Sequence, residues 1–350
     1  MEQVDRVKFY KSLHQLSESS NEDLEQNINA LFTKDVAWRG SEPMNEQNGT
    51  KALLENIWRP LKASFPDMER RDSIFMAGTY EGRQYIASVG HYCANFEKDW
   101  LTIRATGHPV YIRYGEVHEI KDGKIVQSNC LWDVLDVIRQ AGFWPLPPST
   151  GAEGRWSGPN TGDGIQLAPN DPVLSAANLE QTLLMQKSLG DNNGPEHFTR
   201  EGLINMEQKK YWHPKMMWYG PSGVGTTRSL PGFVDYHQLP FRLAFPNRMS
   251  SSLWEGKEEL MKELNAGHYI RVGDGNFSVT GGWPSVVSPH DGEYLGSGAT
   301  GKLLQMRVMD FYHHDEGLIR ENWVPIDIIF LLKQMGVDVF QRMHNEYKLG

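Results

Sequence analysis

Residues 110–134 read VYIRYGEVHEIKDGKIVQSNCLWDV, and this stretch decides the fold class. Polar and apolar side chains alternate along both of its halves. The halves are separated by Asp122-Gly123, a dipeptide typical of two-residue turns between antiparallel strands. Each half, residues 110–120 and residues 125–134, is long enough to form a strand. The stretch therefore predicts a long β-hairpin.

The sequence before this hairpin predicts more strands of the same sheet. Residues 74–80 and 84–96 flank the turn-forming pair Glu81-Gly82 and predict a second hairpin. Residues 36–38 predict a short strand nearer the start of the chain. The strands are long and joined by tight turns, so we expect an antiparallel, curved sheet.

Helices are expected on either side of these strands. Apolar residues recur at helical spacing near the start of the chain, Thr50 is a candidate N-cap, and Gly142 follows the last helix in a position that favours glycine. The expected helices cover residues 5–16, 22–32, 50–60, where Pro60 should end the helix, and 135–141. Helices first and strands after predict an α+β cone whose sheet has one buried concave face.

The chain contains this pattern twice. A shift of 180 residues aligns Trp38 with Trp218, and a shift of 194 aligns Ala105-Thr106-Gly107 with Ala299-Thr300-Gly301. The extra residues in the second copy are assigned mainly to residues 255–268, a charged segment that predicts an added surface helix. We infer a tandem duplication with a Pro- and Gly-rich linker: residues 1–143, 144–172 and 173–350.

Charge and composition indicate which classes of partner the protein can bind and in which compartment it is expected. The 350 residues carry 35 Lys and Arg against 44 Asp and Glu, a net charge of −9, which argues against a nucleic-acid partner. Cys93 and Cys130 are too few for a disulfide framework, which fits a reducing compartment. The start lacks a signal-peptide pattern, and the apolar run 324–332 is interrupted by Asp327 and too short to span a bilayer. We expect a cytoplasmic protein with a small-molecule ligand and no membrane partner.

The turn at Asp122-Gly123 fixes which side chains should share a face. A two-residue turn places Ile112 opposite Asp133, Tyr114 opposite Leu131, Glu116 opposite Asn129, and His118 opposite Gln127. The same construction around Glu316-Gly317 places Met306 opposite Asp327, Asp310 opposite Trp323, and Tyr312 opposite Glu321. Each copy is thus expected to carry a carboxylate pair on one face: Glu116 with Asp133, and Asp310 with Asp327.

Two carboxylates in a partly apolar pocket push one pKa up, so the pair can supply a general acid and a general base. The alternative is that the polar face is the solvent side of an antiparallel sheet. Aromatic and polar residues that could line a ligand cavity form a second set, although at these positions they could equally be core. They are Trp38, Trp58, His91, Tyr114, Asn129, Trp218, Trp283, Tyr312 and Trp323.

No metal or nucleotide site is expected. His313-His314 are adjacent in a predicted strand and point to opposite faces, so they cannot easily chelate one ion. The segment Gly296-Ser-Gly-Ala-Thr-Gly301-Lys302 has Leu303 where a phosphate-binding loop needs Ser or Thr, and a strand follows it rather than a helix. We expect no cofactor.

Successive landmarks of the first copy resemble SnoaL-like polyketide cyclases of the NTF2-like superfamily. They are Phe65-Pro66-Asp67, Ala105-Thr106-Gly107-His108-Pro109-Val110, Asp122-Gly123-Lys124-Ile125-Val126, Trp132-Asp133 and Arg139-Gln140-Ala141-Gly142. The second copy keeps a weaker version, with Phe245-Pro246-Asn247, Asp327 and Lys333-Gln334-Met335-Gly336 among its matches.

The resemblance implies a cofactor-independent enzyme of cyclase, isomerase or lyase type. Asp133 and Asp327 match the family's general acid/base position, where a proton next to a carbonyl is removed, and His118, Asn129 or Tyr114 would polarise the oxygen. Glu116 and Asp310 complete the catalytic candidates. Cones of this superfamily commonly pair through their sheets, which implies an internal pseudo-dimer and leaves further homo-oligomerisation open. A non-catalytic small-molecule binding protein is the alternative function.

Overall fold

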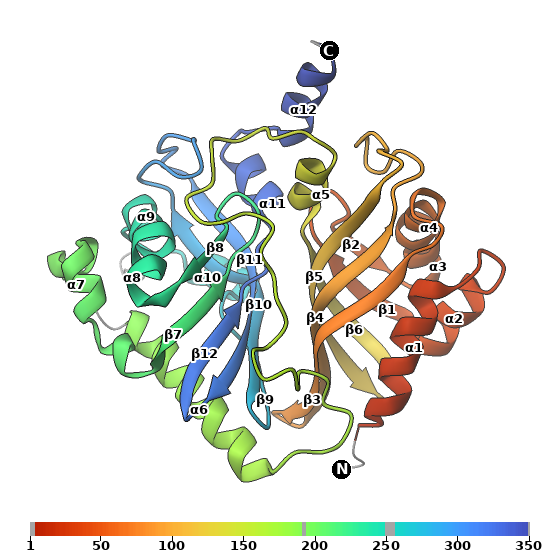
Figure 1. Cartoon of the computed structure of the whole chain (residues 1–350), viewed down its shortest axis with the longest axis horizontal. Helices are drawn as coiled ribbons and strands as arrows, with labels where there is room; N and C mark the ends of the chain where they lie inside the picture. The colour runs from red at the N-terminus through yellow and green to blue at the C-terminus, as the bar shows by residue number, and fades with distance from the viewer. Residues whose placement is uncertain (1–3, 191–193, 249–255, 349–350) are drawn as a thin grey trace. The chain divides into compact units, whose positions relative to one another are not determined.

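The structure is a computed structural model that describes residues 4–190, 194–248 and 256–348. It divides into two compact units (Figure 1). The first comprises Met1–Trp144, Ser157–Asn170 and Phe340–Gly350, and the second comprises Pro145–Trp156 and Asp171–Val339. Two domains within one chain were expected and are present. The domain boundaries at residues 143 and 173 stay a prediction.

The first unit contains helices followed by a six-stranded sheet. In chain order its elements are α1 (Arg6–Glu18), α2 (Leu24–Leu31), β1 (Phe32–Gly40), β2 (Glu46–Asn48), α3 (Thr50–Leu53), a π-helical turn (Leu54–Trp58), α4 (Arg59–Ser64), β3 (Glu69–Tyr80), β4 (Arg83–Asn95), β5 (Pro109–Lys121), β6 (Lys124–Trp132) and α5 (Val134–Gln140). Most of α12 (Val339–Tyr347) also belongs to this unit. The strand order is β2-β1-β6-β5-β4-β3. All neighbours are antiparallel except β1 and β6, which run parallel.

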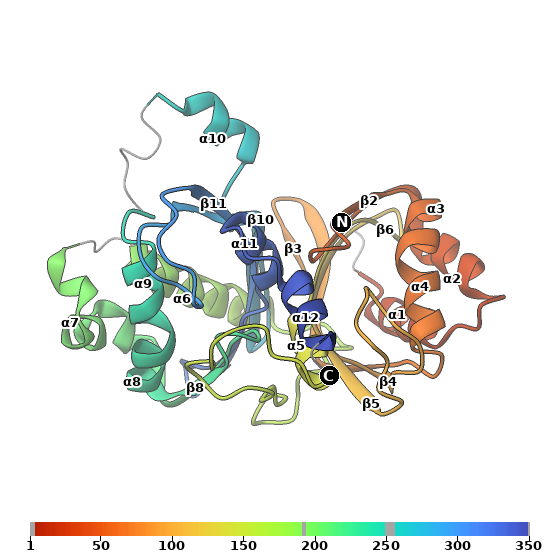
Figure 2. The ribbon, with the colours of Figure 1, turned by 90° about the horizontal axis from the view of Figure 1, so that it is seen from above.

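The helix that begins at Thr50 does not stop at Pro60. It continues through the π-helical turn into α4 and ends at Ser64. Pro60 is the second residue of α4 and follows directly on the π-helical turn, where the regular i to i−4 bonding is already interrupted, so its missing N–H breaks no regular α-helical bond. Helices α1 to α4 lie together on one side of the first sheet (Figure 2).

The second unit repeats this order. Its elements are α6 (Pro172–Gly190), two 3₁₀ turns (Pro195–Phe198 and Glu207–Lys210) flanking α7 (Arg200–Asn205), β7 (Trp212–Tyr219), β8 (Thr226–Arg228), α8 (Ser229–Phe233), a π-helical turn (Val234–Gln238), α9 (Leu239–Ala244), α10 (Glu258–Leu264), β9 (Ile270–Asp274), β10 (Phe277–Pro289), β11 (Leu303–Asp315), β12 (Leu318–Trp323) and α11 (Ile328–Gln334). Its strand order is β8-β7-β12-β11-β10-β9, the same as in the first unit. The predicted α+β class is confirmed in both copies.

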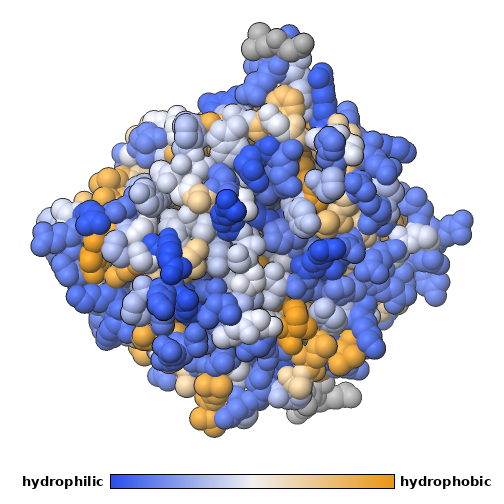
Figure 3. Space-filling model, viewed as in Figure 1, coloured by the Kyte–Doolittle hydropathy of each residue, from blue (hydrophilic) through white to orange (hydrophobic). Residues whose placement is uncertain are grey.

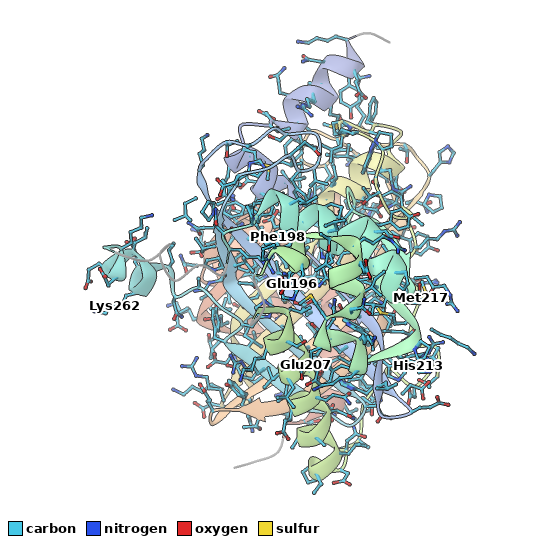
Figure 4. The ribbon with its side chains drawn as sticks, turned by 90° about the vertical axis from the view of Figure 1, so that its left-hand side faces the viewer. Glu196, Phe198, Glu207, His213, Met217 and Lys262 are labelled. Atoms are coloured by element: carbon cyan, nitrogen blue, oxygen red, sulfur yellow. The ribbon has the colours of Figure 1, made fainter. Side chains whose placement is uncertain are left out.

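The second unit differs from the first at two helices. The added surface helix is confirmed as α10, which stands apart from the sheet of its unit and carries Lys262 (Figures 2 and 4). Residue 255, where that helix was expected to begin, lies outside the described residues.

Helix α6 leaves Val173 75% exposed and Leu174 41% exposed, and apolar surface shows near the bottom of Figure 3, where α6 begins. No helix in the described ranges has the length and apolar character to cross a membrane.

The predicted hairpin register is wrong by one residue in both copies. Ile120 pairs with Ile125 as expected, but an irregularity between Glu119 and Ile120 shifts the rest, so that Glu116 pairs with Cys130. In the second unit His314 pairs with Ile319, whereas His313 pairs with Glu321. Such a bulge inserts one extra residue into one strand, and a shift of one residue moves side chains to the other face.

The shift corrects each of the predicted facing pairs that involve a site residue. Tyr114 faces Trp132, Glu116 faces Cys130, and His118 faces Ser128. Tyr312 faces Asn322, and Trp323 faces Phe311. Asn129 therefore lies on the face away from Glu116, and Trp323 lies on the face away from Asp310.

The linker is bound to the body of the protein along both of its halves. In the first unit, Phe75 N donates to Gly164 O at 2.9 Å and Gln166 N donates to Phe75 O at 2.8 Å. In the second, Ala152 and Thr226 exchange two backbone hydrogen bonds of 2.9 Å. Phe75 belongs to β3 and Thr226 to β8, the edge strands of their sheets, so the linker covers backbone groups that would otherwise invite pairing with another chain.

Candidate active site

A buried arginine organises the concave face of the first unit. Arg70 on β3 has no exposed side-chain surface, and its Nη1 donates to Glu116 Oε2 on β5 at 2.7 Å. Its Nε donates to Asp72 Oδ1 at 3.0 Å, because residues two apart in a strand share a face. The guanidinium also lies 4.5 Å from the centroid of the Tyr114 ring. One cation therefore serves both carboxylates.

Glu116 is held in its ionised form. Tyr92 Oη and Trp132 Nε1 both donate to Oε1, at 2.9 and 2.8 Å, and His118 Nε2 lies 3.5 Å from Oε2. Burial alone would raise the pKa of Glu116, but the Arg70 charge and then the contacts with His118 and Arg70 outweigh it. The pKa of Glu116 therefore lies well below its usual range. A carboxylate fixed in this way is a weak proton carrier near neutral pH.

Asp72 is also held in its ionised form. It connects the buried face of the first sheet to the protein surface. Tyr114 Oη donates to Asp72 Oδ1 at 2.7 Å, and His14 Nε2 on α1 lies 2.8 Å from Oδ2. Burial would raise the pKa of Asp72, but the Arg70 charge and these hydrogen bonds lower it. The side chain of His14 is 24% exposed, so this chain of polar contacts reaches solvent.

Asp310 occupies the position of Glu116 in the second unit. Glu116 pairs with Ser88 on β4, and Asp310 pairs with Thr280 on β10, a hydroxyl residue in each case. The Asp310 side chain is 14% exposed, and His268 Nδ1 lies 3.8 Å from its Oδ2. Among the residues that the structure describes, no Lys or Arg forms an ion pair with Asp310.

In this pair the usual order of the pKa values of aspartate and histidine is reversed. Burial raises the pKa of Asp310 to about 7, and hydrogen bonds to Asn322 and Tyr312 oppose that effect only in part. Burial and then the charge of Arg271 lower the pKa of His268 to about 4. Near neutral pH the site thus holds a carboxyl group that can either give or take a proton, beside a neutral imidazole.

Neighbouring amide and hydroxyl groups position the pair. Gln186 Nε2 on α6 donates to Thr280 Oγ1 at 2.7 Å and to Tyr312 Oη at 3.0 Å. His268 Nδ1 lies 3.0 Å from Thr280 Oγ1. Burial raises the pKa of Tyr312 well above its usual value, so its phenol stays neutral and can donate to Asp310. The site could offer a metal two ligands, His268 and Asp310, fewer than the three or four that protein zinc sites use.

A difference in strand length explains why the two copies diverge. In the first unit β3 extends to Glu69, which places Arg70 opposite Tyr92. In the second, β9 begins at Ile270, and its own arginine, Arg271, lies opposite Thr280 and donates its Nε to His268 O at 2.7 Å rather than forming an ion pair with Asp310. His268, in the segment between α10 and β9, lies beside the carboxylate instead.

Asp133 and Asp327 are helix caps bound to arginines. Asp133 Oδ1 accepts the N–H of Asp136 at 3.0 Å, and its Oδ2 accepts from Arg113 Nη2 at 2.6 Å. Asp327 accepts from Phe330 N at 3.1 Å and from Arg307 Nη1 at 3.0 Å. Arg113 neighbours Tyr114 in β5 and so projects from the opposite face to Glu116. The expected carboxylate pairs are therefore not formed, although a catalytic role for either aspartate stays a prediction.

The other candidates divide between the two faces. Trp38 and Trp58 lie on the concave side of the first unit, where both meet the Trp132 ring edge to face at 5.9 and 6.2 Å. Trp218 stacks on His237 at 4.0 Å in the second unit. His91 pairs with Arg113 and so projects from the face opposite to Tyr114, and its place in a ligand cavity stays a prediction. In the second unit Arg307 lies 4.7 Å from the centroid of the Trp283 ring.

Sequence reasoning missed the residues that set the charge of each face. In the first unit these are Arg70, Asp72, His14 and Tyr92; in the second they are His268, Thr280, Gln186 and Asn322. Arg70 and Asp72 are two residues apart in a strand, and that spacing could have been noticed. His268 lies outside the repeated pattern, so no alignment of the two halves points to it.

No family model matches the sequence, and none of the curated proteins matches it. Solved structures do. The chain resembles SnoaL-like proteins in fold. One match is a candidate SnoaL-like polyketide cyclase from Jannaschia sp. CCS1, with 14% identity and a TM-score of 0.34, covering 42% of this chain and 99% of that one.

Two more solved structures match with similar identity, TM-score and coverage. IdmH, a candidate polyketide cyclase from Streptomyces antibioticus, has 17% identity and a TM-score of 0.33, covering 39% of this chain and 99% of its own. An NTF2-like protein of unknown function from Burkholderia pseudomallei has 14% identity and a TM-score of 0.31, covering 39% and 97%. These likenesses concern the fold alone.

Proposed function

We propose that the chain is a cofactor-independent enzyme that moves a proton next to a carbonyl group, and that Asp310 in the second domain is its general base and acid. The observation that carries this proposal is the environment of Asp310. Burial without a neighbouring Lys or Arg among the described residues raises its pKa to about 7, the value at which a carboxyl serves both roles at neutral pH.

The surrounding groups fit roles in this reaction. Asp310 would remove the proton and return it elsewhere as a cyclase, isomerase or lyase requires. His268, at 3.8 Å and neutral, is placed to share the proton with it. Tyr312 and Asn322 hydrogen-bond Asp310, and Gln186 holds the Tyr312 phenol at 3.0 Å, so the base has a fixed orientation.

The substrate should be a small, uncharged and largely apolar carbonyl compound. Asp310 has amide, hydroxyl and imidazole neighbours. Arg271 on β9, whose charge acts on His268, donates its Nε to His268 O at 2.7 Å, so its guanidinium is already engaged by the protein. The first domain, with Glu116 neutralised by Arg70, would be a structural copy. The proposed active copy is thus the second one, in which the family landmarks are weaker.

The proposal can be tested without knowing the natural substrate. The full chain is incubated in D₂O with aryl alkyl ketones, whose α-protons exchange slowly by themselves, and exchange is followed by ¹H NMR. We expect saturable exchange that falls by at least about a hundredfold in Asp310→Asn, because general-base catalysis contributes roughly 10² to 10⁴ in rate.

Asp133→Asn and Asp327→Asn serve as comparators, because asparagine keeps the helix cap while removing the carboxylate. Exchange should survive in both. Loss of exchange in these two variants, with exchange retained in Asp310→Asn, would move the chemistry to the caps and contradict the proposal. An absence of exchange across the ketone panel in the unmodified chain would favour a non-catalytic binding protein.

A further inference from the structure

A cavity in the second unit shares no described lining residue with the Asp310 site. Its volume is about 240 Å³, and it lies between the first part of the linker, the π-helical turn before α9 and the loop that follows β10. Its lining includes Pro147, Tyr236, His237, Glu293 and Tyr294. Neither the duplication nor the proposed reaction accounts for it.

The linker forms one wall of this cavity and is fixed in place. Thr150 Oγ1 donates to Tyr236 O at 2.5 Å, and the next residue, Gly151, donates its N–H to Val224 O at 2.8 Å. Pro147 packs so closely on Gly296 that a Cβ there would lie 2.5 Å from its Cγ. The wall is therefore bound to the domain as closely as a packed element, and the cavity it encloses is a built feature.

The side chains that line the cavity carry charge of one sign. Glu293 is the single charged side chain among the described lining residues, and no Lys or Arg is among them. One carboxylate oxygen of Glu293 accepts the N–H of Gly296 at 2.7 Å, which fixes the group at the cavity. His237 adds no positive charge, since burial and then the charge of Arg248 lower its pKa to about 3.

Three of the lining residues carry aromatic rings. Tyr236, Tyr294 and His237 line the cavity together with prolines and leucines. The combination of aromatic rings with one carboxylate is what recognises alkylammonium groups, because the face of an aromatic ring attracts a cation that is too weakly hydrated to resist desolvation. A carboxylate repels an anion, and apolar walls do not replace the water that a strongly hydrated ion would lose.

We propose that this cavity binds a small organic cation, an alkylammonium or quaternary ammonium group. The volume of about 240 Å³ is below that of sites for drug-sized ligands, so the ligand is a compact head group of a few heavy atoms. The net charge of −9 on the chain attracts such a cation from solution.

The test uses choline and 3,3-dimethylbutan-1-ol, in which a carbon atom replaces the charged nitrogen and the shape is kept. Binding of each to the full chain is measured by isothermal titration calorimetry at low ionic strength. We expect choline to bind and its neutral counterpart to bind at least about threefold to tenfold more weakly, the range that a cation–π contact provides.

Substitutions of lining residues test whether choline binds in this cavity. Glu293→Gln and Tyr236→Ala should each weaken choline binding by a similar factor, whereas Tyr236→Phe, which keeps the ring, should not. Glu259→Gln is the matched control, because it removes the same charge from a side chain on α10 that is 90% exposed. Folding of each variant is checked by circular dichroism.

Three results would overturn the inference. They are equal affinity for choline and the neutral alcohol, unchanged choline affinity in Glu293→Gln, and no choline binding by the unmodified chain. Loss of ketone exchange in Asp310→Asn tests a different site, so either idea can fail alone.

Discussion

Two residues at the same position of the repeat have opposite protonation behaviour. Glu116 on β5 and Asp310 on β11 lie at the same place in the strand order of their sheets, and each faces a hydroxyl residue. Arg70 holds the pKa of Glu116 low, while burial raises the pKa of Asp310 from 3.8 to about 7. The latter shift corresponds to about 4 kcal/mol in favour of the neutral acid. A single cation decides which copy can carry a proton.

The prediction for single residues concerns the stability that Arg70 provides. Arg70→Met would leave Glu116 and Asp72 buried without their arginine, and we expect a loss of about 3 to 5 kcal/mol in the stability of the first domain. Urea unfolding of the full chain measures it. Arg71→Met is the control: this neighbour is 60% exposed, and removing its surface ion pair should cost less than about 1 kcal/mol. Equal effects of the two substitutions would contradict the account.

The pH dependence of this stability has a definite sign. The folded-state pKa of Glu116 lies below its unfolded value, so its contribution is present above that unfolded value and is lost as the pH falls below about 4. Arg70→Met should remove that contribution, which makes the first domain of the variant less sensitive to acid. The same urea series, repeated between pH 3 and pH 7, checks it.

At the scale of elements, the sequence predicted the strands well and their register poorly. Asp122-Gly123 and Glu81-Gly82 turn where expected, since these dipeptides have positive φ angles of 50° and 73°, and of 49° and 77°. The bulge at Glu119 to Ile120 has no sequence signature of its own, yet it moves Asn129 to the other face. Pro60 misled because a proline usually ends a helix, whereas here the π-helical turn before it accommodates the missing N–H, and no sequence signal marks that turn.

The cap of α5 carries the prediction for this scale. Asp133→Ala removes both the bond to Asp136 N and the ion pair with Arg113, and we expect it to cost about 1 to 3 kcal/mol, since Arg113 keeps Asp136 3.4 Å from its Nε. Asp133→Asn should cost less, because asparagine caps helices well. Urea unfolding distinguishes the two. If asparagine proves as costly as alanine, the cap contributes nothing measurable.

Over the whole chain, one fold is used twice with different electrostatics. Strand order and the helix-to-sheet sequence are the same in both units, which the repeat in the sequence predicted. The chemistry could not be predicted in that way, because it depends on where β3 and β9 begin and on a histidine outside the repeat. Comparison of the two copies identified Glu116 and Asp310 as candidates, but it did not identify the groups that set their charges.

Linkage gives the two carboxyl groups opposite consequences for stability. The folded-state pKa of Asp310 is raised, so its contribution is complete below about pH 4 and is lost as the pH rises through about 7. Glu116 contributes in the reverse sense. Acid should therefore weaken the first domain, and mildly alkaline solution the second.

The central claim is that Asp310 holds its proton near neutral pH while Glu116 does not. It is tested by ¹³C NMR titration of the side-chain carboxyl groups in the full chain, with Asp310→Asn and Glu116→Gln used to assign the two resonances. The account predicts a midpoint near pH 7 for Asp310 and no titration of Glu116 above pH 4. A midpoint for Asp310 near the ordinary aspartate value of about 3.9 would contradict it.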